Sequence, residues 1–208
     1  MTGHRVTVDW MGEQIETLAD LFPPEPRAVC VGINPAPRSV EAGHYYQGRQ
    51  GQRFFGRLRQ AEVLGAVSDG FEDDAALAAG IGFTDVLKRP TPSADLLTSA
   101  EKRHGVELLA EKLAAVRAPV IIFPFKAAAV ELVGRFEDNG WLRQEFAGSR
   151  LFVMPPYESA TTAAPTLASL RSGISRLGVP VPRSDLLTPP SANAETGWTG
   201  PPSSPGSG

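Results

Sequence analysis

Cysteine is almost absent from this chain, since Cys30 is its single thiol among 208 residues. One cysteine excludes an internal disulfide, a four-thiolate zinc site and a four-cysteine iron-sulfur cluster. Cys30 falls within a hydrophobic run, where a free thiol packs as a small apolar side chain. The sequence also lacks a run of about 18 apolar residues and the basic-then-apolar start of a secretion signal. We therefore expect a cytoplasmic protein with no membrane span.

A strong charge of either sign is missing as well. The formal net charge is −3 and the pI is about 5.7, which argues against a protein that holds nucleic acid through its overall charge. The charges are unevenly distributed, because residues 38–59 hold five arginines and one glutamate, whereas acids gather at residues 72–74. The arginine-rich segment provides either a local basic face or a solvated helix flank.

The hydrophobic pattern predicts an α/β fold. Short apolar runs bounded by turn residues predict buried strands at residues 28–33, 81–86, 120–125 and 151–154. Apolar positions three and four apart predict helices at residues 10–22, 54–64, 100–116, 127–136 and 166–177. Strands that alternate with helix-sized connections pair in parallel and carry helices on both faces. We therefore expect a three-layer α/β/α sandwich with a central, mainly parallel four-stranded sheet.

The predicted domain covers residues 1–182, a length that supports one sizeable hydrophobic core. Residues 183–208 are rich in Pro, Ser and Gly, a composition typical of a disordered tail. In open parallel sheets, ligands bind beyond the carboxyl ends of the strands. The segments that follow the predicted strands are therefore where functional residues are expected.

The segment after the first predicted strand reads GINPA, at residues 32–36. Taken alone, Asn34-Pro35 after a strand is typical of a turn. The segment is followed by GHYYQGRQGQRFF and then by GIGFTDVLKRPTPSADLLTSAE. In order and spacing these three segments resemble the mismatch-specific uracil and thymine-DNA glycosylases of the uracil-DNA glycosylase superfamily, whose first motif reads GINPG. The resemblance covers about residues 27–177, with Ala36 in place of the final glycine.

The resemblance implies hydrolysis of the bond between a flipped base and its deoxyribose. That reaction needs a positioned water, donors for the pyrimidine oxygens and a flat surface against the flipped ring. Asn34 matches the family asparagine that positions the water, which its amide does without deprotonating anything. Gly32, Ile33 and Pro35 are expected against the base, because glycine permits close approach and Ile33 supplies an apolar wall.

Aromatic residues of the second segment are candidates for stacking on the extruded base. Tyr46 is the first candidate and Tyr45 the second, because the chain has one extra residue before the run that contains Phe54 and Phe55. Phe55 is expected either against the substrate or in the core, since both phenylalanines open a helix. His44 is expected either against the substrate or on a surface loop.

Candidate DNA contacts follow the second, third and fourth predicted strands. Lys88 and Arg89 are placed to contact phosphates, although a solvated pair fits the sequence equally well. Lys126 opens a helix, where a positive charge is locally unfavourable, and is therefore expected to have an anionic partner.

The second family motif is expected after the fourth strand, where this chain reads MPPYESAT. Pro155 fits the motif, whereas Pro156 and Tyr157 depart from it, and Ser159 follows. Tyr157 is the candidate wedge that intercalates where the base leaves the stack. No histidine is present here to stabilise a leaving pyrimidine oxygen, so a slow enzyme is expected.

The sequence therefore predicts a monofunctional DNA glycosylase that releases uracil from double-stranded DNA to initiate base excision repair. Thymine, hypoxanthine and substituted pyrimidines are further candidate bases. The alternative is a lesion- or abasic-site-binding protein of the same fold with little catalysis. An unrelated hydrolase or nucleotide-binding protein is disfavoured, because GxxxxGK and GxSxG are absent. We expect no metal, no cofactor and no obligate protein partner, and a nucleoid-associated monomer.

Overall fold

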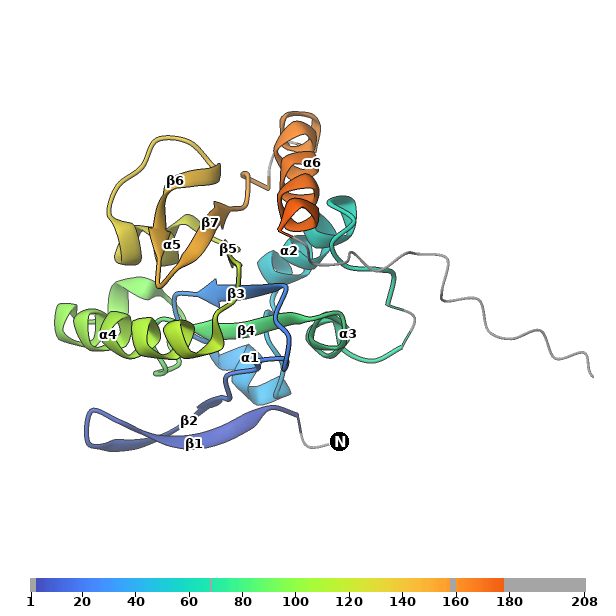
Figure 1. The fold of residues 1–208 in the computed structure, drawn as a ribbon. Coiled ribbons are helices and arrows are strands. Elements are labelled where there is room, and N and C mark those ends of the chain that lie inside the picture. Colours follow the sequence, from blue (N-terminus) through green and yellow to red (C-terminus); the bar gives the residue numbers. More distant parts are fainter. Residues whose placement is uncertain (1–2, 68, 158–159, 178–208) are drawn as a thin grey trace, which may run out of the picture.

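The centre of the molecule is a five-stranded sheet with the spatial order β4-β3-β5-β7-β6 (Figure 1). The computed structural model describes residues 3–67, 69–157 and 160–177. The parallel strands are β3 (Ala28–Gly32), β4 (Ile81–Asp85), β5 (Val120–Phe123) and β7 (Ser149–Val153). β6 (Gly140–Phe146) pairs antiparallel with β7. The predicted α/β fold with a mainly parallel sheet is confirmed, and a fifth strand is added at its edge.

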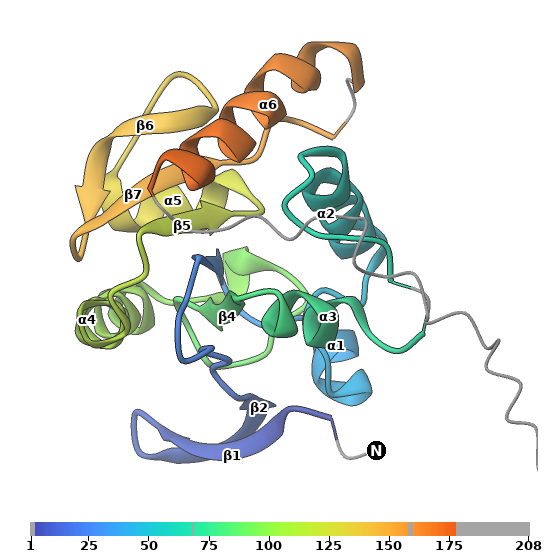
Figure 2. The ribbon, with the colours of Figure 1, turned by 45° about the vertical axis from the view of Figure 1, so that its right-hand side comes forward.

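Helices cover both faces of the sheet (Figures 1 and 2). One face carries α2 (Arg49–Gln60), α3 (Glu72–Ala78) and α6 (Ala160–Arg176), and the other carries α4 (Ser99–Val116) and α5 (Lys126–Val133). Neighbouring strand residues alternate between the two cores, because side chains of a strand point to opposite faces. Cys30 belongs to the first core and Val31 to the second. None of the described helices has the length and apolar character that crossing a membrane requires.

The chain begins with a two-stranded hairpin of β1 (Arg5–Trp10) and β2 (Glu13–Leu18). It lies apart from the central sheet, at the bottom of Figures 1 and 2. The predicted helix over residues 10–22 is wrong. Met11 and Gly12 both have positive φ, 56° and 89°, which is the two-residue turn that matches the twist of a hairpin. The burial of β1 alternates residue by residue, as in a strand with one covered face.

Beyond the hairpin, β6, α1 (Pro37–Ala42), α3 and the short 3₁₀ turn at Ala94–Leu96 were also not predicted from the sequence. β6 has the polar residues Arg143, Gln144 and Glu145 exposed at the edge of the sheet, where charged side chains protect an open strand from aggregation. α1 is only 6 residues long, too short to show helical spacing. The predicted tail, residues 183–208, lies outside the described residues.

Candidate active site

A cavity of about 160 Å³ lies beyond the carboxyl ends of β3, β4 and β5. The chain crosses from β3 to β4 on one side and later to β5 on the other, so the cavity occupies the switch point at which open α/β sheets bind ligands. An apolar cavity of roughly 150 Å³ holds one benzene ring. The lining residues that matter below are Gly32, Ile33, Asn34, Pro35, Ser39, Tyr45, Tyr46, Asp85 and Phe125.

The side chain of Asn34 is held by its amide nitrogen. Nδ2 donates to Thr91 Oγ1 at 2.8 Å, to the Arg89 carbonyl at 3.0 Å and to the Pro35 carbonyl at 3.2 Å. Both amide protons are therefore committed to acceptors within the protein. These acceptors also define which end of the amide is nitrogen. Asn34 lines the cavity, and among the described residues its Oδ1 takes part in no hydrogen bond, so this oxygen is available as an acceptor whose orientation is fixed by Nδ2.

Asp85 ends β4 and lies beside Gly32, the last residue of β3, because these residues are register partners in the parallel pair. Its side chain is buried, and Oδ2 has no hydrogen-bond partner within the described part of the chain. Burial raises the pKa of Asp85 to about 7; the nearby Lys88 opposes this rise and Asp20 adds to it. The cavity floor thus contains a carboxyl group that changes charge near neutral pH.

Tyr46 supplies a second buried oxygen without a partner among the described residues. Its ring lies 5.3 Å from the Phe54 ring and 6.1 Å from the Phe55 ring, measured between centroids. The backbone of Tyr46 is left-handed, with φ 58°, and a Cβ on Gly51 would overlap its carbonyl oxygen. Burial, followed by the charge of Asp85, raises the pKa of the Tyr46 phenol well above its usual range. Tyr46 therefore faces the cavity as a neutral hydroxyl donor.

The model of the uracil DNA glycosylase superfamily matches residues 19–170, which is most of the chain. The chain belongs to the uracil DNA glycosylase superfamily. It is also 26% identical over 150 residues to a G/U mismatch-specific uracil DNA glycosylase from Schizosaccharomyces pombe. That similarity covers 67% of this chain and 46% of the yeast protein, so the chain spans about half the length of this relative.

Lys88 of this superfamily member does not reach the surface. Its side chain is buried, and the ammonium donates to the Asp20 carboxylate and to the Leu18 carbonyl. The predicted phosphate contact of Lys88 is therefore wrong, because a buried cation bound on these oxygens cannot approach DNA. Arg89 is one-third exposed and pairs with Glu101 through two nitrogens.

Lys126 is exposed at the start of α5, and its ammonium lies 4.7 Å from the centre of the Phe136 ring. Among the described residues it forms no ion pair. The anionic partner that the sequence suggested for Lys126 is therefore not found within the described chain, and the cation is instead supported by an aromatic face.

The segment after β7 meets the cavity wall through Tyr157, which packs beside the lining residue Phe125. The Tyr157 hydroxyl donates to the Pro124 carbonyl at 2.7 Å, and its ring lies 5.8 Å from that of Phe125. Pro155 is buried and Pro156 is exposed. Tyr157 would have to leave these contacts to enter a base stack as a wedge. Ser159 lies outside the described residues.

The structure places Phe55 in the second of its two expected positions and places His44 away from the surface. Phe55 is fully buried in the core and is not among the residues that line the cavity, so its predicted substrate contact is wrong. The reason is that its helix turns this face toward the sheet. His44 is also buried and meets Asp73, so the expectation of a surface loop histidine is wrong.

Asp85 and Phe125 are site residues that the sequence reasoning missed. Each was placed inside a predicted strand, whereas β4 ends at Asp85 and β5 ends two residues before Phe125. An acidic residue at the end of an otherwise apolar strand was the available signal, since ligands bind at carboxyl ends.

Proposed function

We propose that the chain is a monofunctional DNA glycosylase that hydrolyses the N-glycosidic bond of uracil flipped out of double-stranded DNA. The observation that carries this proposal is the oriented Asn34 amide at the wall of a cavity suited to one ring. Membership of the superfamily and the yeast relative support the same activity. Thymine, hypoxanthine and substituted pyrimidines are further candidate substrates.

In the proposed reaction Asn34 Oδ1 accepts a hydrogen bond from a water molecule and thereby turns the water oxygen toward C1′ of the sugar. The bond from C1′ to the base breaks, and its electron pair leaves with the base. The water oxygen then bonds to C1′ and releases a proton to solvent, and the departing base takes up a proton. Asn34 contributes positioning, and no proton passes through its amide.

The buried oxygens of Asp85 and Tyr46 lie where a flipped base would enter. A uracil ring presents two carbonyl acceptors and one ring N–H donor. The Tyr46 hydroxyl can donate to a carbonyl oxygen, and the ionised Asp85 carboxylate can accept from the N–H. Leaving either oxygen unpaired in a buried site is costly, so a base with this pattern is preferred to one without it.

The DNA-binding face that we propose lies on α1 and α2 beside the cavity. Arg38, Arg49 and Arg53 are exposed, and among the described residues they form no ion pair. Their neighbours in sequence, Ala36 and Gln50, line the cavity. The remaining two arginines of the basic segment are engaged: Arg57 contacts Gln60, and Arg59 pairs with Glu72. Three exposed cations on elements that border the cavity suit contacts with the phosphates of a flipped nucleotide.

The experiment compares base release by the unmodified chain, Asn34→Ala and Asn139→Ala on duplexes that contain G:U, G:T or hypoxanthine. Abasic products are detected by alkaline cleavage, and DNA binding is measured separately by fluorescence anisotropy. Asn139 lies in the loop before β6 and is the matched control. We expect uracil release to fall on the order of 10²-fold in Asn34→Ala, with unchanged binding and a normal Asn139→Ala.

Two results would contradict the proposal. Equal turnover by Asn34→Ala and the unmodified chain would remove Asn34 from the reaction. Tight binding of abasic or damaged DNA with no base release by the unmodified chain would instead identify a lesion-binding protein of the same fold.

A further inference from the structure

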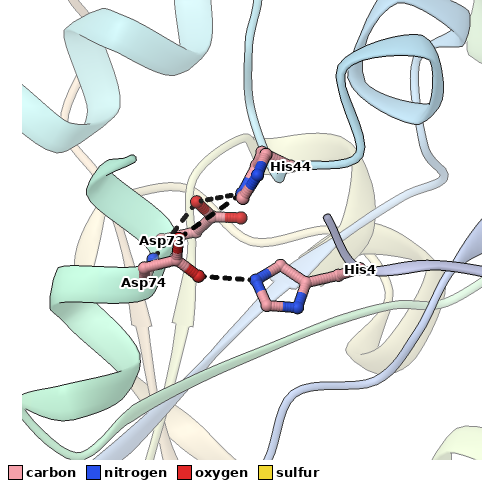
Figure 3. A group of neighbouring side chains, drawn as sticks. All are labelled: His4, His44, Asp73 and Asp74. Atoms are coloured by element: carbon pink, nitrogen blue, oxygen red, sulfur yellow. Dashed lines mark hydrogen bonds and ion pairs between the residues drawn. The ribbon is translucent and has the colours of Figure 1, made fainter. Parts of the chain in front are cut away.

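A cluster of four potential metal ligands lies away from the cavity floor, where three segments meet (Figure 3). His4 precedes β1, His44 lies between α1 and α2, and Asp73 and Asp74 belong to α3. One nitrogen or oxygen from each side chain lies within 4.8 Å of all the others. The folded chain therefore assembles a set of ligands that has no recognisable spacing in the sequence.

The distances within the cluster suit a small cation. His4 Nε2 lies 2.6 Å from Asp74 Oδ1, and His44 Nδ1 lies 3.1 Å from Asp73 Oδ1 and 3.9 Å from Asp74 Oδ2. In a tetrahedral zinc site with bonds of about 2.0–2.2 Å, neighbouring ligand atoms are roughly 3.3–3.6 Å apart. The observed separations lie on both sides of this range, and all four atoms lie within 4.8 Å of one another, so the cluster spans the spacing that a zinc ion requires.

The inner half of the cluster is held firmly by its surroundings. Asp73 and His44 are both buried. The second carboxylate oxygen of Asp73 accepts from the Tyr45 backbone N–H at 2.7 Å, and the His44 ring stacks on Phe71 with centroids 3.5 Å apart. Supporting contacts of this kind orient metal ligands and fix the atom that each presents.

The outer half is placed by backbone contacts. The His4 N–H donates to the Gly43 carbonyl at 2.6 Å, and the His4 carbonyl accepts from the Ala19 N–H at 2.8 Å. Among the described residues no lysine or arginine lies within ion-pair distance of either aspartate, and the carboxylates contact only these two histidines at such distances. With neutral imidazoles the cluster carries two negative charges, which one divalent cation balances.

We infer that His4, His44, Asp73 and Asp74 form a structural site for one divalent transition-metal ion, with zinc as the preferred ion. Two imidazole nitrogens and two carboxylate oxygens satisfy tetrahedral zinc, whereas magnesium and calcium favour more oxygen ligands. Four protein ligands leave no open position for a reactive water, so the site is structural. The ion would tie the start of the chain and α3 to the segment that carries Tyr45 and Tyr46 into the cavity.

The test uses tag-free, full-length protein freed of metal with a chelator and then titrated with Zn²⁺ by calorimetry. We expect one Zn²⁺ per chain and a higher Tm when zinc is present. Co²⁺ should give the intense visible absorption of a tetrahedral site. His4→Ala and Asp74→Asn change partly exposed residues and should fold, while the dissociation constant for Zn²⁺ rises at least tenfold in each.

His104→Ala is the matched control. His104 is the remaining histidine of the chain, and it lies on α4 with its ring packed against Trp10. It should bind one Zn²⁺ as the unmodified chain does. Absence of stoichiometric Zn²⁺ binding, or unchanged binding in both His4→Ala and Asp74→Asn, would overturn the inference and leave two His-Asp hydrogen bonds. These readouts do not depend on uracil release, so failure of the metal site and failure of the proposed activity are distinguishable.

Discussion

The Asp85 carboxylate lies directly against the Cα of Gly32, at the place where a side chain of any other residue would begin. The two residues end neighbouring parallel strands in register. The Tyr46 hydroxyl approaches the same point, 3.2 Å from where a Cβ on Gly32 would lie. Glycine is required here because the Asp85 and Tyr46 side chains approach its Cα so closely. Its φ is not in the left-handed region, so the backbone conformation alone would allow another residue.

Gly32→Ala should displace the Asp85 carboxylate. The added methyl group leaves no room for the present side-chain positions, and overpacking of this kind costs about 1–3 kcal/mol of unfolding free energy. We expect a lower urea midpoint and a loss of uracil release on the order of 10²-fold, because groups facing the base are misplaced. Urea unfolding and single-turnover base release measure the two effects.

Gly56→Ala is the control for this substitution. Gly56 lies within α2, and a Cβ there meets only the Arg59 side chain, at 4.0 Å. Alanine in a helix interior is more favourable than glycine by up to about 1 kcal/mol, so the variant should be at least as stable and equally active. If Gly32→Ala kept the stability and activity of the unmodified chain, the side chains around Gly32 would be able to accommodate a methyl group, and the prediction would be wrong.

The stability of the protein should depend on pH through Asp85. The pKa of this carboxyl is raised to about 7 from 3.8, chiefly by burial, so the folded chain keeps a proton that the unfolded chain has lost. The contribution of protonated Asp85 to the unfolding free energy is therefore fully present at low pH. It is lost as the pH rises from about 4 through 7, at up to about 1.4 kcal/mol per pH unit.

Asp85→Asn removes this titration. Urea unfolding at pH 5 and pH 8 should show that the unfolding free energy of the variant falls less over this interval than that of the unmodified chain. Asp138→Asn, which changes an exposed carboxylate, should show the same decrease in unfolding free energy between pH 5 and pH 8 as the unmodified chain. An identical pH dependence in Asp85→Asn would contradict a titrating group at the cavity floor.

Lys88→Met should lower the unfolding free energy without changing the affinity for DNA. Lys88 and Lys112 both bind the Asp20 carboxylate, and removing one partner of a buried ion pair costs roughly 3–5 kcal/mol. Lys112 remains beside Asp20 and reduces the loss. We expect a clearly lower urea midpoint but an unchanged salt dependence of DNA affinity in the folded variant. A shallower salt dependence would restore Lys88 as a phosphate contact.

Arg49→Gln combined with Arg53→Gln should weaken DNA binding without affecting stability. Each lost phosphate contact lowers the slope of log K against log salt concentration by about 0.9. Anisotropy titrations over a series of salt concentrations measure that slope. Arg143→Gln, on the exposed edge strand β6, is the control and should leave it unchanged. Equal slopes for all three proteins would remove α2 from the proposed DNA-binding face.

The sequence by itself determined the fold class and the place of Asn34 after the first strand of the sheet. The four buried strands are short apolar runs, and a parallel pair needs a helix-sized connection, so local pattern and chain connectivity lead to one fold class. Asn34 comes two residues after the end of β3, where residues of a parallel strand meet the ligand crevice, and it lines the cavity; its role in the reaction stays a prediction.

Only the tertiary structure decided which charged and polar side chains are buried. Lys88 follows β4 as an exposed phosphate contact would, yet a carboxylate that lies 68 residues away in the sequence holds it inside. His4, His44 and Asp73 are brought together from separate segments in the same way. Such contacts depend on the relative placement of elements that share no local pattern. Hydrophobic periodicity records which face of an element is covered, whereas the partner of a buried charge is set by the packing of the whole chain.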